Sequence, residues 1–195
     1  MARSNGLLKI LSESRACTVC AEHLPLGPRP LLAAGMKARV LLIGQAPGRS
    51  THESGIPWGD RSGDRLRDWL GIDRETFYDP NRAALLPMGF CYPGSGKQGD
   101  LPPRKECAPL WHPQVLPLLK ETRLTIYLGR YAVVRYLGES YGSLTAAAEA
   151  YGDLLSDAVA LPHPSPRNGM WTSKRPWFSK ILLPMLRARV GESLA

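Results

Sequence analysis

The sequence contains no long apolar run, and none of its hydrophobic stretches approaches the roughly 18 residues that a membrane-spanning helix needs. The first residues include one basic side chain, but no apolar segment follows them, so we expect no secretory signal and a cytoplasmic protein. Internal repeats and low-complexity tracts are also missing. With 195 residues, 44% of them hydrophobic, the chain is long enough to bury a full core, and we expect residues 1–195 to form one domain.

Acidic residues are absent from one long stretch near the C-terminus, between Ala158 and Gly191. The same stretch holds the basic residues Arg167, Lys174, Arg175, Lys180, Arg187 and Arg189. The chain as a whole has a net charge of +8, and such basicity is typical of proteins with polyanionic partners. We therefore predict that the C-terminal part presents a phosphate-contacting face, with nucleic acid as the favoured partner.

What the sequence has instead is an alternation of short apolar stretches with helical patterns. The expected strands are 40–44, 83–86, 124–128 and 158–161. The expected helices are 7–16, one capped by Ser62 or Asp64 that ends at Leu70, a proline-broken helix at 105–120, 129–137, 143–150 and 175–189. Residues 49–60 and 92–103 are expected to be loops. Strands that alternate with helices predict an α/β domain with a mostly parallel sheet.

The first expected strand ends abruptly in the turn Gly44-Gln45-Ala46-Pro47-Gly48. Four apolar residues without polar alternation suit a strand that is buried on both faces. Ligands of such sheets bind outside the carboxyl ends of the strands. The two glycines let the backbone approach a ligand closely, and the proline stiffens the loop. The turn is therefore either part of a binding site or an ordinary strand-to-loop connection.

The four cysteines, Cys17, Cys20, Cys91 and Cys107, form a C-x2-C pair followed by a C-x15-C pair. Disulfides are disfavoured in a cytoplasmic chain. Four thiolates can hold a structural zinc ion or an iron–sulfur cluster, or the thiols can be unrelated. The wide second pair argues against a zinc ribbon, whereas the expected position of every cysteine in a loop or at an element end lets ligands converge. A metal centre is the favoured interpretation.

Three stretches and the cysteines together resemble uracil-DNA glycosylases, most closely the iron–sulfur type called family four. The turn at 44–48 resembles the first motif of that family, Gly-Glu-Ala-Pro-Gly, and Gly55-Ile56-Pro57-Trp58 resembles its Gly-Arg-Pro-Phe segment. The segment His163-Pro164-Ser165-Pro166-Arg167-Asn168 resembles the second motif, His-Pro-Ser-Pro. The cysteine spacing is similar to that of the cluster ligands, and the resemblance covers roughly residues 10–189.

The resemblance implies a three-layer α/β/α fold with a central four-stranded parallel sheet. It implies a monomer that binds DNA containing a damaged base and hydrolyses the N-glycosidic bond of uracil or a related deaminated base, in base-excision repair. It also implies that the four cysteines hold a 4Fe-4S cluster, with zinc as the alternative. Because a base inside a duplex cannot be attacked, it must be flipped into a pocket or presented unpaired.

Site residues follow from the matched motifs. Trp58 stands where a flipped base would stack, and His163 can hydrogen-bond the base as negative charge grows on it. The base pocket is expected to comprise Gly44, Ala46, Pro47, Gly48, Trp58, Met88 and Gly89. DNA contacts are expected from Ser165, Pro166, Arg167, Asn168, Lys174 and Arg175, the first three of which can press on the minor groove.

The first motif departs from the family at the residue that activates water. Gln45 stands where family four has Glu, and Ala46 stands where the classical enzymes have Asp. Gln45 can position a water but cannot take its proton, so His52 and Glu53, a few residues on, are the candidate replacements. These residues complete the predicted catalytic set of His163, Gln45, Glu53 and His52. The missing acid favours an alternative function, in which the protein binds damaged or abasic DNA with little or no excision.

A second departure concerns base recognition. Pro87 stands where the family commonly has an Asn that pairs with the uracil edge, so the backbone groups of Met88 or Gly89 are the expected substitutes. The basic insert that carries a crosslinking histidine in one relative has no counterpart, because residues 92–104 contain no His. We therefore expect no covalent attachment to abasic DNA.

Overall fold

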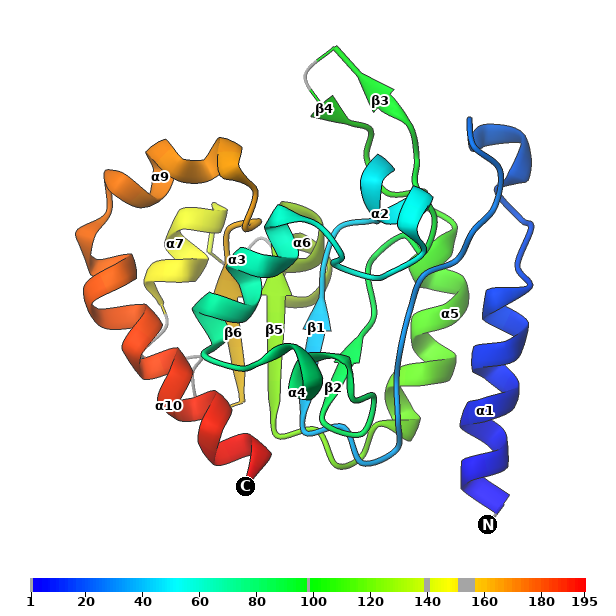
Figure 1. The fold of residues 1–195 in the computed structure, drawn as a ribbon, viewed down its shortest axis with the longest axis horizontal. Helices are drawn as coiled ribbons and strands as arrows, with labels where there is room; N and C mark the ends of the chain where they lie inside the picture. Colours follow the sequence, from blue (N-terminus) through cyan, green and yellow to red (C-terminus); the bar gives the residue numbers. More distant parts are fainter. Residues whose placement is uncertain (1, 98, 139–140, 151–156) are drawn as a thin grey trace.

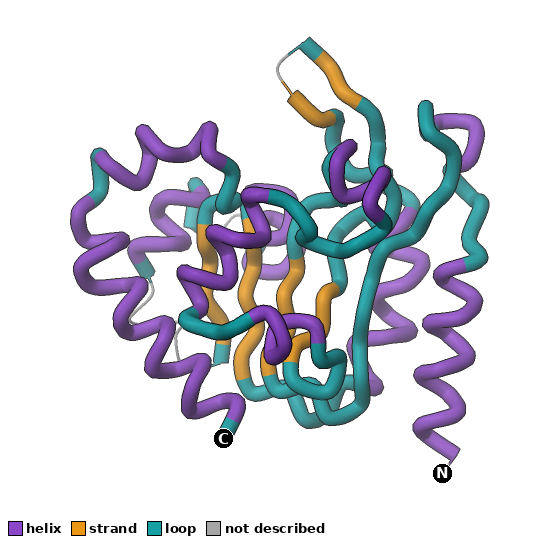
Figure 2. Tube along the Cα trace, viewed as in Figure 1, coloured by secondary structure: helices purple, strands orange, loops and turns teal. Residues whose placement is uncertain are grey.

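A central sheet of four parallel strands organises the protein in a computed structural model, which describes residues 2–97, 99–138, 141–150 and 157–195 (Figures 1 and 2). The strands are β1 (Val40–Ile43), β2 (Ala83–Leu85), β5 (Leu124–Leu128) and β6 (Ala158–Leu161). Their order is β2-β1-β5-β6, and Leu42 lies between Leu85 and Ile126 in the register. All four predicted strands are confirmed, to within one residue at their ends.

Helices cover both faces of this sheet, because alternate side chains of a strand point in opposite directions. Val40 and Leu42 face a core formed with α3 (Arg61–Leu70), α4 (Arg74–Tyr78) and the C-terminal helix α10 (Leu183–Leu194). Leu41 and Ile43 face a second core formed with α1 (Ala2–Arg15), α5 (Cys107–Val115) and α6 (Arg130–Leu137). The predicted three-layer α/β/α fold with a four-stranded parallel sheet is therefore confirmed.

The remaining elements are short and lie between these layers or at their rims. They are the 3-10 turns Ala21–His23, Leu116–Leu118 and Pro166–Asn168, the helices α2 (Arg49–Ser54), α7 (Leu144–Glu149) and α9 (Gly169–Ser173), the π-helical turn Phe178–Leu182, and the strands β3 (Ser95–Gly96) and β4 (Gly99–Asp100). The antiparallel β3–β4 hairpin projects beyond the carboxyl-terminal edge of the sheet (Figure 1). Within the described part of the chain, no helix combines the length and the apolarity that crossing a bilayer requires.

Several predicted boundaries are wrong for identifiable reasons. The cap of α3 is Asp60, whose carboxylate accepts a hydrogen bond from the Gly63 amide (3.0 Å), and not Ser62 or Asp64, which lie inside the helix. The segment 49–60, expected to be a loop, contains α2, and the loop 92–103 contains the hairpin. The proline-broken helix becomes α5 with a following 3-10 turn, and the final helix extends to Leu194.

Candidate functional site

A cavity of about 430 Å³ opens at the carboxyl ends of the strands, beside the point where strand order reverses between β1 and β5. Such switch points are where parallel α/β sheets bind ligands. Nine of the predicted site residues line it: Gln45, Ala46, Pro47, Gly48, Trp58, His163, Ser165, Arg167 and Asn168. Segments that are more than a hundred residues apart in sequence therefore meet around one space.

The turn after β1 forms one side of the cavity, and the ring of Trp58 leaves no room for a side chain at Gly44. A Cβ atom on Gly44 would stand 2.7 Å from the ring of Trp58, so only glycine lets the indole lie against the backbone here. Gly48 ends the turn and caps α2, with an extended backbone. The turn is therefore shaped by close packing against Trp58, as well as by its connection to the strand.

Trp58 has a strained backbone that its surroundings hold in place. Its φ of 55° lies in the left-handed region, which a bulky residue rarely adopts. The Trp58 carbonyl accepts hydrogen bonds from the Tyr78 hydroxyl (3.2 Å) and from Arg67 Nη1 (3.4 Å). Gly63 leaves room for the same carbonyl, since a Cβ there would collide with it. Helices α3 and α4 thus fix the direction in which the indole enters the cavity.

His163 follows β6 and faces Trp58 across a stacked contact, with ring centroids 5.5 Å apart. Its backbone carbonyl accepts a hydrogen bond from Asn168 Nδ2 (2.7 Å), and the next residues are anchored by Arg65 Nη1 on the Ser165 carbonyl (3.2 Å). Burial lowers the pKa of His163, and the carboxylates of Asp60 and Asp100 oppose that shift. The imidazole is therefore neutral at pH 7, where it can donate one N–H into the cavity.

His52 and Glu53, the predicted replacement bases, do not line the cavity. The Glu53 carboxylate is exposed on α2 and pairs with Arg49 (2.9 Å). His52 is 6% exposed, lies beside the ring of Tyr92, and its Nδ1 has no hydrogen-bond partner among the described residues. Only Thr51 of this helix lines the cavity, because α2 turns the next two side chains away from it.

Met88 and Gly89, which we predicted in the base pocket, also lie outside the cavity lining, as does Gly44. The amides of Met88 and Gly89 donate to the carbonyls of Gly44 (2.8 Å) and Gln45 (2.9 Å). These two hydrogen bonds hold the turn in place, and the two N–H groups are therefore not available to a base. Pro87, one residue earlier, is the member of this segment that lines the cavity.

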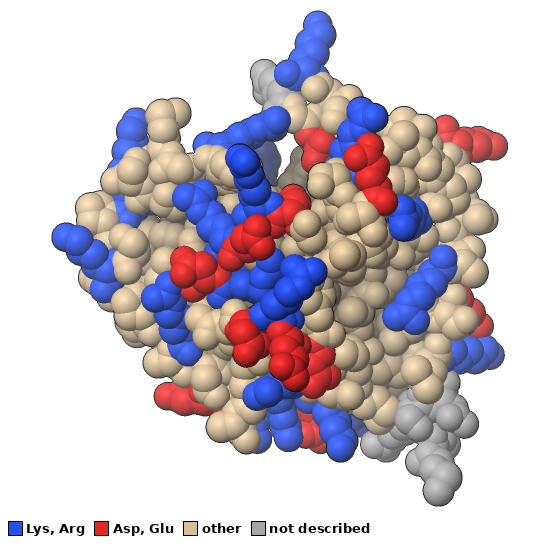
Figure 3. Space-filling model, viewed as in Figure 1, with Lys and Arg blue, Asp and Glu red and all other residues tan. Residues whose placement is uncertain are grey.

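The predicted DNA-contacting residues divide into two groups. Ser165, Arg167 and Asn168 line the cavity, while Pro166 and Lys174 are exposed outside it. Arg175 lies over the ring of Trp171 (4.5 Å to the centroid), so its guanidinium forms a cation–π contact within the protein. Figure 3 shows basic side chains over α3, α9 and α10, next to a hollow beneath the hairpin, with acidic side chains interspersed among those over α3.

Sequence reasoning missed two carboxylates of the cavity, Asp60 and Asp100. The position of Asp60, two residues after Trp58 in the sequence, could have indicated that it lies near the cavity. No sequence feature indicated this for Asp100, because the hairpin that brings it to the cavity was expected to be a loop. The hairpin also meets the His163 segment: the guanidinium of Arg167 lies so close to Gly99 that a Cβ there would collide with it.

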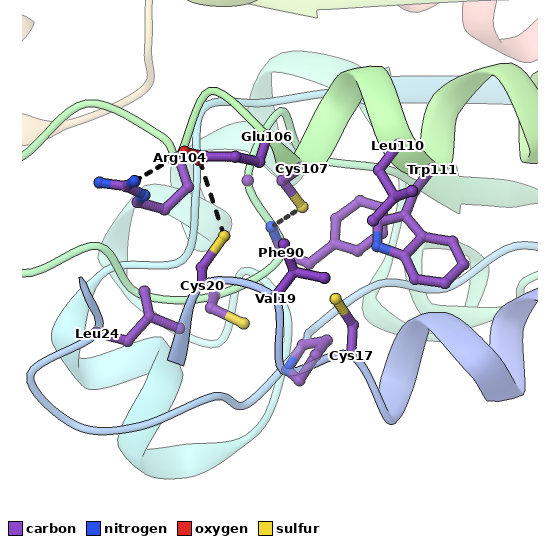
Figure 4. A pocket seen from close by; sticks show the side chains of 13 residues that line it. Cys17, Val19, Cys20, Leu24, Phe90, Arg104, Glu106, Cys107, Leu110 and Trp111 are labelled. Carbon is purple, nitrogen blue, oxygen red and sulfur yellow. Dashed lines mark hydrogen bonds and ion pairs between the residues drawn. The ribbon is translucent and has the colours of Figure 1, made fainter. Parts of the chain in front are cut away.

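The four cysteines lie together at a different place, around a small apolar cavity of about 20 Å³ (Figure 4). The thiols of Cys17, Cys20 and Cys107 face the same space in this view, and Cys91 also lines it. Burial raises the pKa of Cys91 to about 11 and that of Cys107 to about 12. Among the described residues, no three potential ligands converge closely enough to hold a single metal ion.

One comparison with known proteins identifies a family. The family model described as the uracil DNA glycosylase superfamily matches residues 33–187. The match contains the whole sheet, the turn after β1, Trp58 and the His163 segment. It begins after Cys17 and Cys20, so half of the cysteine set lies outside it.

Proposed function

The chain belongs to the uracil DNA glycosylase superfamily, and from this premise we propose that it hydrolyses the N-glycosidic bond of uracil or a related deaminated base in DNA. One observation carries the proposal. The turn after β1, the indole of Trp58 and the imidazole of His163 surround one cavity at the carboxyl edge of the sheet. Damaged DNA is the proposed partner, bound by a monomer in base-excision repair.

The residues of the cavity suit the charges that develop in this reaction. As the bond breaks, positive charge grows on the sugar and negative charge grows on the leaving base. The neutral imidazole of His163 can donate a hydrogen bond to the base as it becomes an anion. The indole of Trp58 supplies an apolar face beside it, and such faces bind a flipped or unpaired base.

We also propose that the four cysteines hold an iron–sulfur cluster. The donor set fits, because four thiols surround one small cavity and no other free cysteine is present. A cluster would bind each of the four thiolates to a different iron, whereas the alternative, a zinc ion, would draw all four to about 2.3 Å from one centre. When bound, it would crosslink residues 17–20 to the segment 91–107.

A second function is favoured by the missing acid at Gln45 and Ala46. In this alternative the protein binds damaged or abasic DNA and releases a base slowly or not at all. The two functions differ in one measurement, the release of free base.

The deciding experiment uses oligonucleotides that carry uracil, hypoxanthine or xanthine, each as single and double strands. Release of one of these bases, with an abasic product that alkali cleaves, supports the glycosylase. Binding without release on every substrate overturns it and leaves the binding protein. His163→Gln should lower release at least tenfold more than it weakens binding, because its proposed role is in the transition state.

A further inference from the structure

The cavity lacks a carboxylate on the turn where the superfamily resemblance places one. Gln45 and Ala46 carry no titratable group, and the candidate replacements on α2 point elsewhere: Glu53 pairs with Arg49, and His52 is buried against Tyr92. A group that accepts a proton from water must therefore come from another segment.

Two carboxylates line the cavity, and they are held differently. Asp60 is the cap of α3, and one of its oxygens accepts the amide hydrogen of Gly63. Asp100 lies at the end of the β3–β4 hairpin, and its Oδ2 stands 3.4 Å from the position that a Cβ on Gly48 would occupy. Asp100 therefore reaches the turn that lacks an acid, whereas Asp60 has a structural role in starting a helix.

A chain of hydroxyl groups orients the Asp100 carboxylate. The Ser95 hydroxyl lies opposite Asp100 in the hairpin register and donates to its Oδ1 (3.1 Å). The Tyr92 hydroxyl lies 2.7 Å from Ser95 Oγ. Because Ser95 has one hydroxyl hydrogen and uses it on Asp100, the Tyr92 hydroxyl must donate to Ser95.

These hydrogen-bonded hydroxyl groups leave one oxygen of Asp100 directed at the turn. They begin at Tyr92, which is buried, with 3% of its surface exposed. A backbone hydrogen bond from the Leu101 amide to the Gly94 carbonyl (2.8 Å) closes the base of the hairpin. Oδ1 is occupied by Ser95, and Oδ2 faces Gly48. A carboxylate that is exposed but oriented in this way can hold a water molecule between itself and a bound nucleotide.

We infer that Asp100 is the catalytic residue that orients the attacking water and accepts its proton, and that Ser95 and Tyr92 are its positioning residues; this rests on the proposed glycosylase function. The water oxygen forms a bond to C1′ of the deoxyribose. The C1′–N bond breaks, and its electron pair leaves with the base, which His163 stabilises. The water proton passes to Asp100 and then to the departed base or to solvent. Water and the damaged nucleotide thus give an abasic sugar and a free base.

The test measures single-turnover release and binding separately, on the oligonucleotide that gives the highest release with the unchanged protein. Asp100→Asn should lower the release rate about 100-fold, within the range of general base catalysis, and should leave the dissociation constant within about twofold. Glu13→Gln on α1 is the matched control, because it removes one exposed carboxylate that pairs with Lys9 and does not line the cavity.

Two further variants separate a chemical role from a structural one. The double variant Asp100→Asn with Gln45→Glu should release base at least tenfold faster than Asp100→Asn alone, because it puts a carboxylate back on the turn. A damaged hairpin would not be repaired by a substitution at residue 45. Ser95→Ala should lower the rate about tenfold by releasing the carboxylate, while Ser95→Thr, which keeps the hydroxyl, should return it.

The outcomes distinguish the two proposals. If the unchanged protein releases no base from any substrate, the glycosylase function and this inference both fail. If the unchanged protein releases base and Asp100→Asn is as fast, the function stands and the role of Asp100 is wrong. A third variant, Asp60→Asn, tests the other carboxylate of the cavity. If Asp60→Asn loses base release, if Gln45→Glu restores that release, and if Asp100→Asn loses none, the role belongs to Asp60 instead. Loss of binding and release together in Asp100→Asn would also overturn the inference.

Discussion

The indole of Trp58 stacks on the imidazole of His163, with an angle of 27° between the two planes. The two rings come from opposite sides of the cavity, one from the segment before α3 and the other from the end of β6. The strained backbone of Trp58 is tied to α3 and α4, and the His163 carbonyl is tied to Asn168. A base that enters the cavity therefore meets one fixed aromatic wall.

Replacement of Trp58 by alanine should weaken binding of a damaged strand. Loss of an aromatic stacking partner costs about 1–3 kcal/mol per base, so we expect the dissociation constant to rise about 5- to 150-fold. The measurement is fluorescence anisotropy with a single-stranded oligonucleotide that carries a non-hydrolysable uracil nucleotide. Trp58→Phe keeps a ring and should recover most of the affinity. Equal affinity of the alanine variant and the unchanged protein would show that the base does not stack here.

Replacement of Arg29 by methionine should loosen the helix that follows the turn. Arg29 Nη1 donates to the carbonyls of His52 (2.6 Å) and Glu53 (3.0 Å), at the carboxyl end of α2, and a cation is favourable there. We expect the free energy of unfolding to fall by about 1 kcal/mol and base release to fall with it. Both are measured on the same preparation, by urea denaturation and by the release assay.

The control for this change is Arg39→Met. Arg39 pairs with Glu121 (2.6 Å) and precedes β1, at the opposite edge of the sheet from the cavity. We expect it to change stability by a similar amount without lowering base release. Equal loss of release in both variants would mean that Arg29 acts through general stability alone.

His112 should make stability depend on pH. It is 1% exposed, its Nε2 donates to the Pro87 carbonyl (3.0 Å), and its Nδ1 accepts from the Tyr136 hydroxyl. Burial lowers its pKa to about 4, whereas in the unfolded chain the pKa returns to about 6.5. Below pH 6.5 the unfolded chain binds a proton that the folded protein does not bind. Stability should therefore fall as the pH drops from about 6.5 towards 4, by up to about 3 kcal/mol.

His112→Gln removes this titration and tests the sign. The measurement is the free energy of unfolding between pH 4.5 and about 7.5, by urea denaturation, for both proteins. The advantage of the unchanged protein should shrink as the pH falls, since only it loses stability through residue 112. A difference that stays constant with pH would contradict a buried neutral His112.

Replacement of Cys107 by serine should abolish binding of iron and sulfide. The unchanged protein, prepared without oxygen, should be brown and contain both, because four cysteine side chains surround the cavity and their thiolates can bind the irons. Val19→Ala is the matched control, since Val19 lines the same cavity, is 63% exposed and offers no ligand atom. Iron content and visible absorption are the readouts. A colourless protein that contains zinc in place of iron and sulfide would overturn the cluster.

The sequence by itself determined the sheet and most of the cavity wall. The apolar stretch at 40–43 suits a strand buried on both faces, and the motifs at 44–48, 58 and 163–168 can be read from the sequence as local patterns. Their residues line one cavity because parallel strands bring their carboxyl ends to one edge. The sequence does not show that the amides of Met88 and Gly89 already donate to the carbonyls of Gly44 and Gln45.

Only the tertiary structure decided which acids and bases face that cavity. His52 and Glu53 are close to the turn in sequence, but α2 rotates one into a buried site and the other into an ion pair with Arg49. Asp100 is far from the turn in sequence, and a short hairpin with no apolar alternation brings it to Gly48. Side-chain direction in a short helix or hairpin depends on what packs against it. The local pattern of residues does not contain that information.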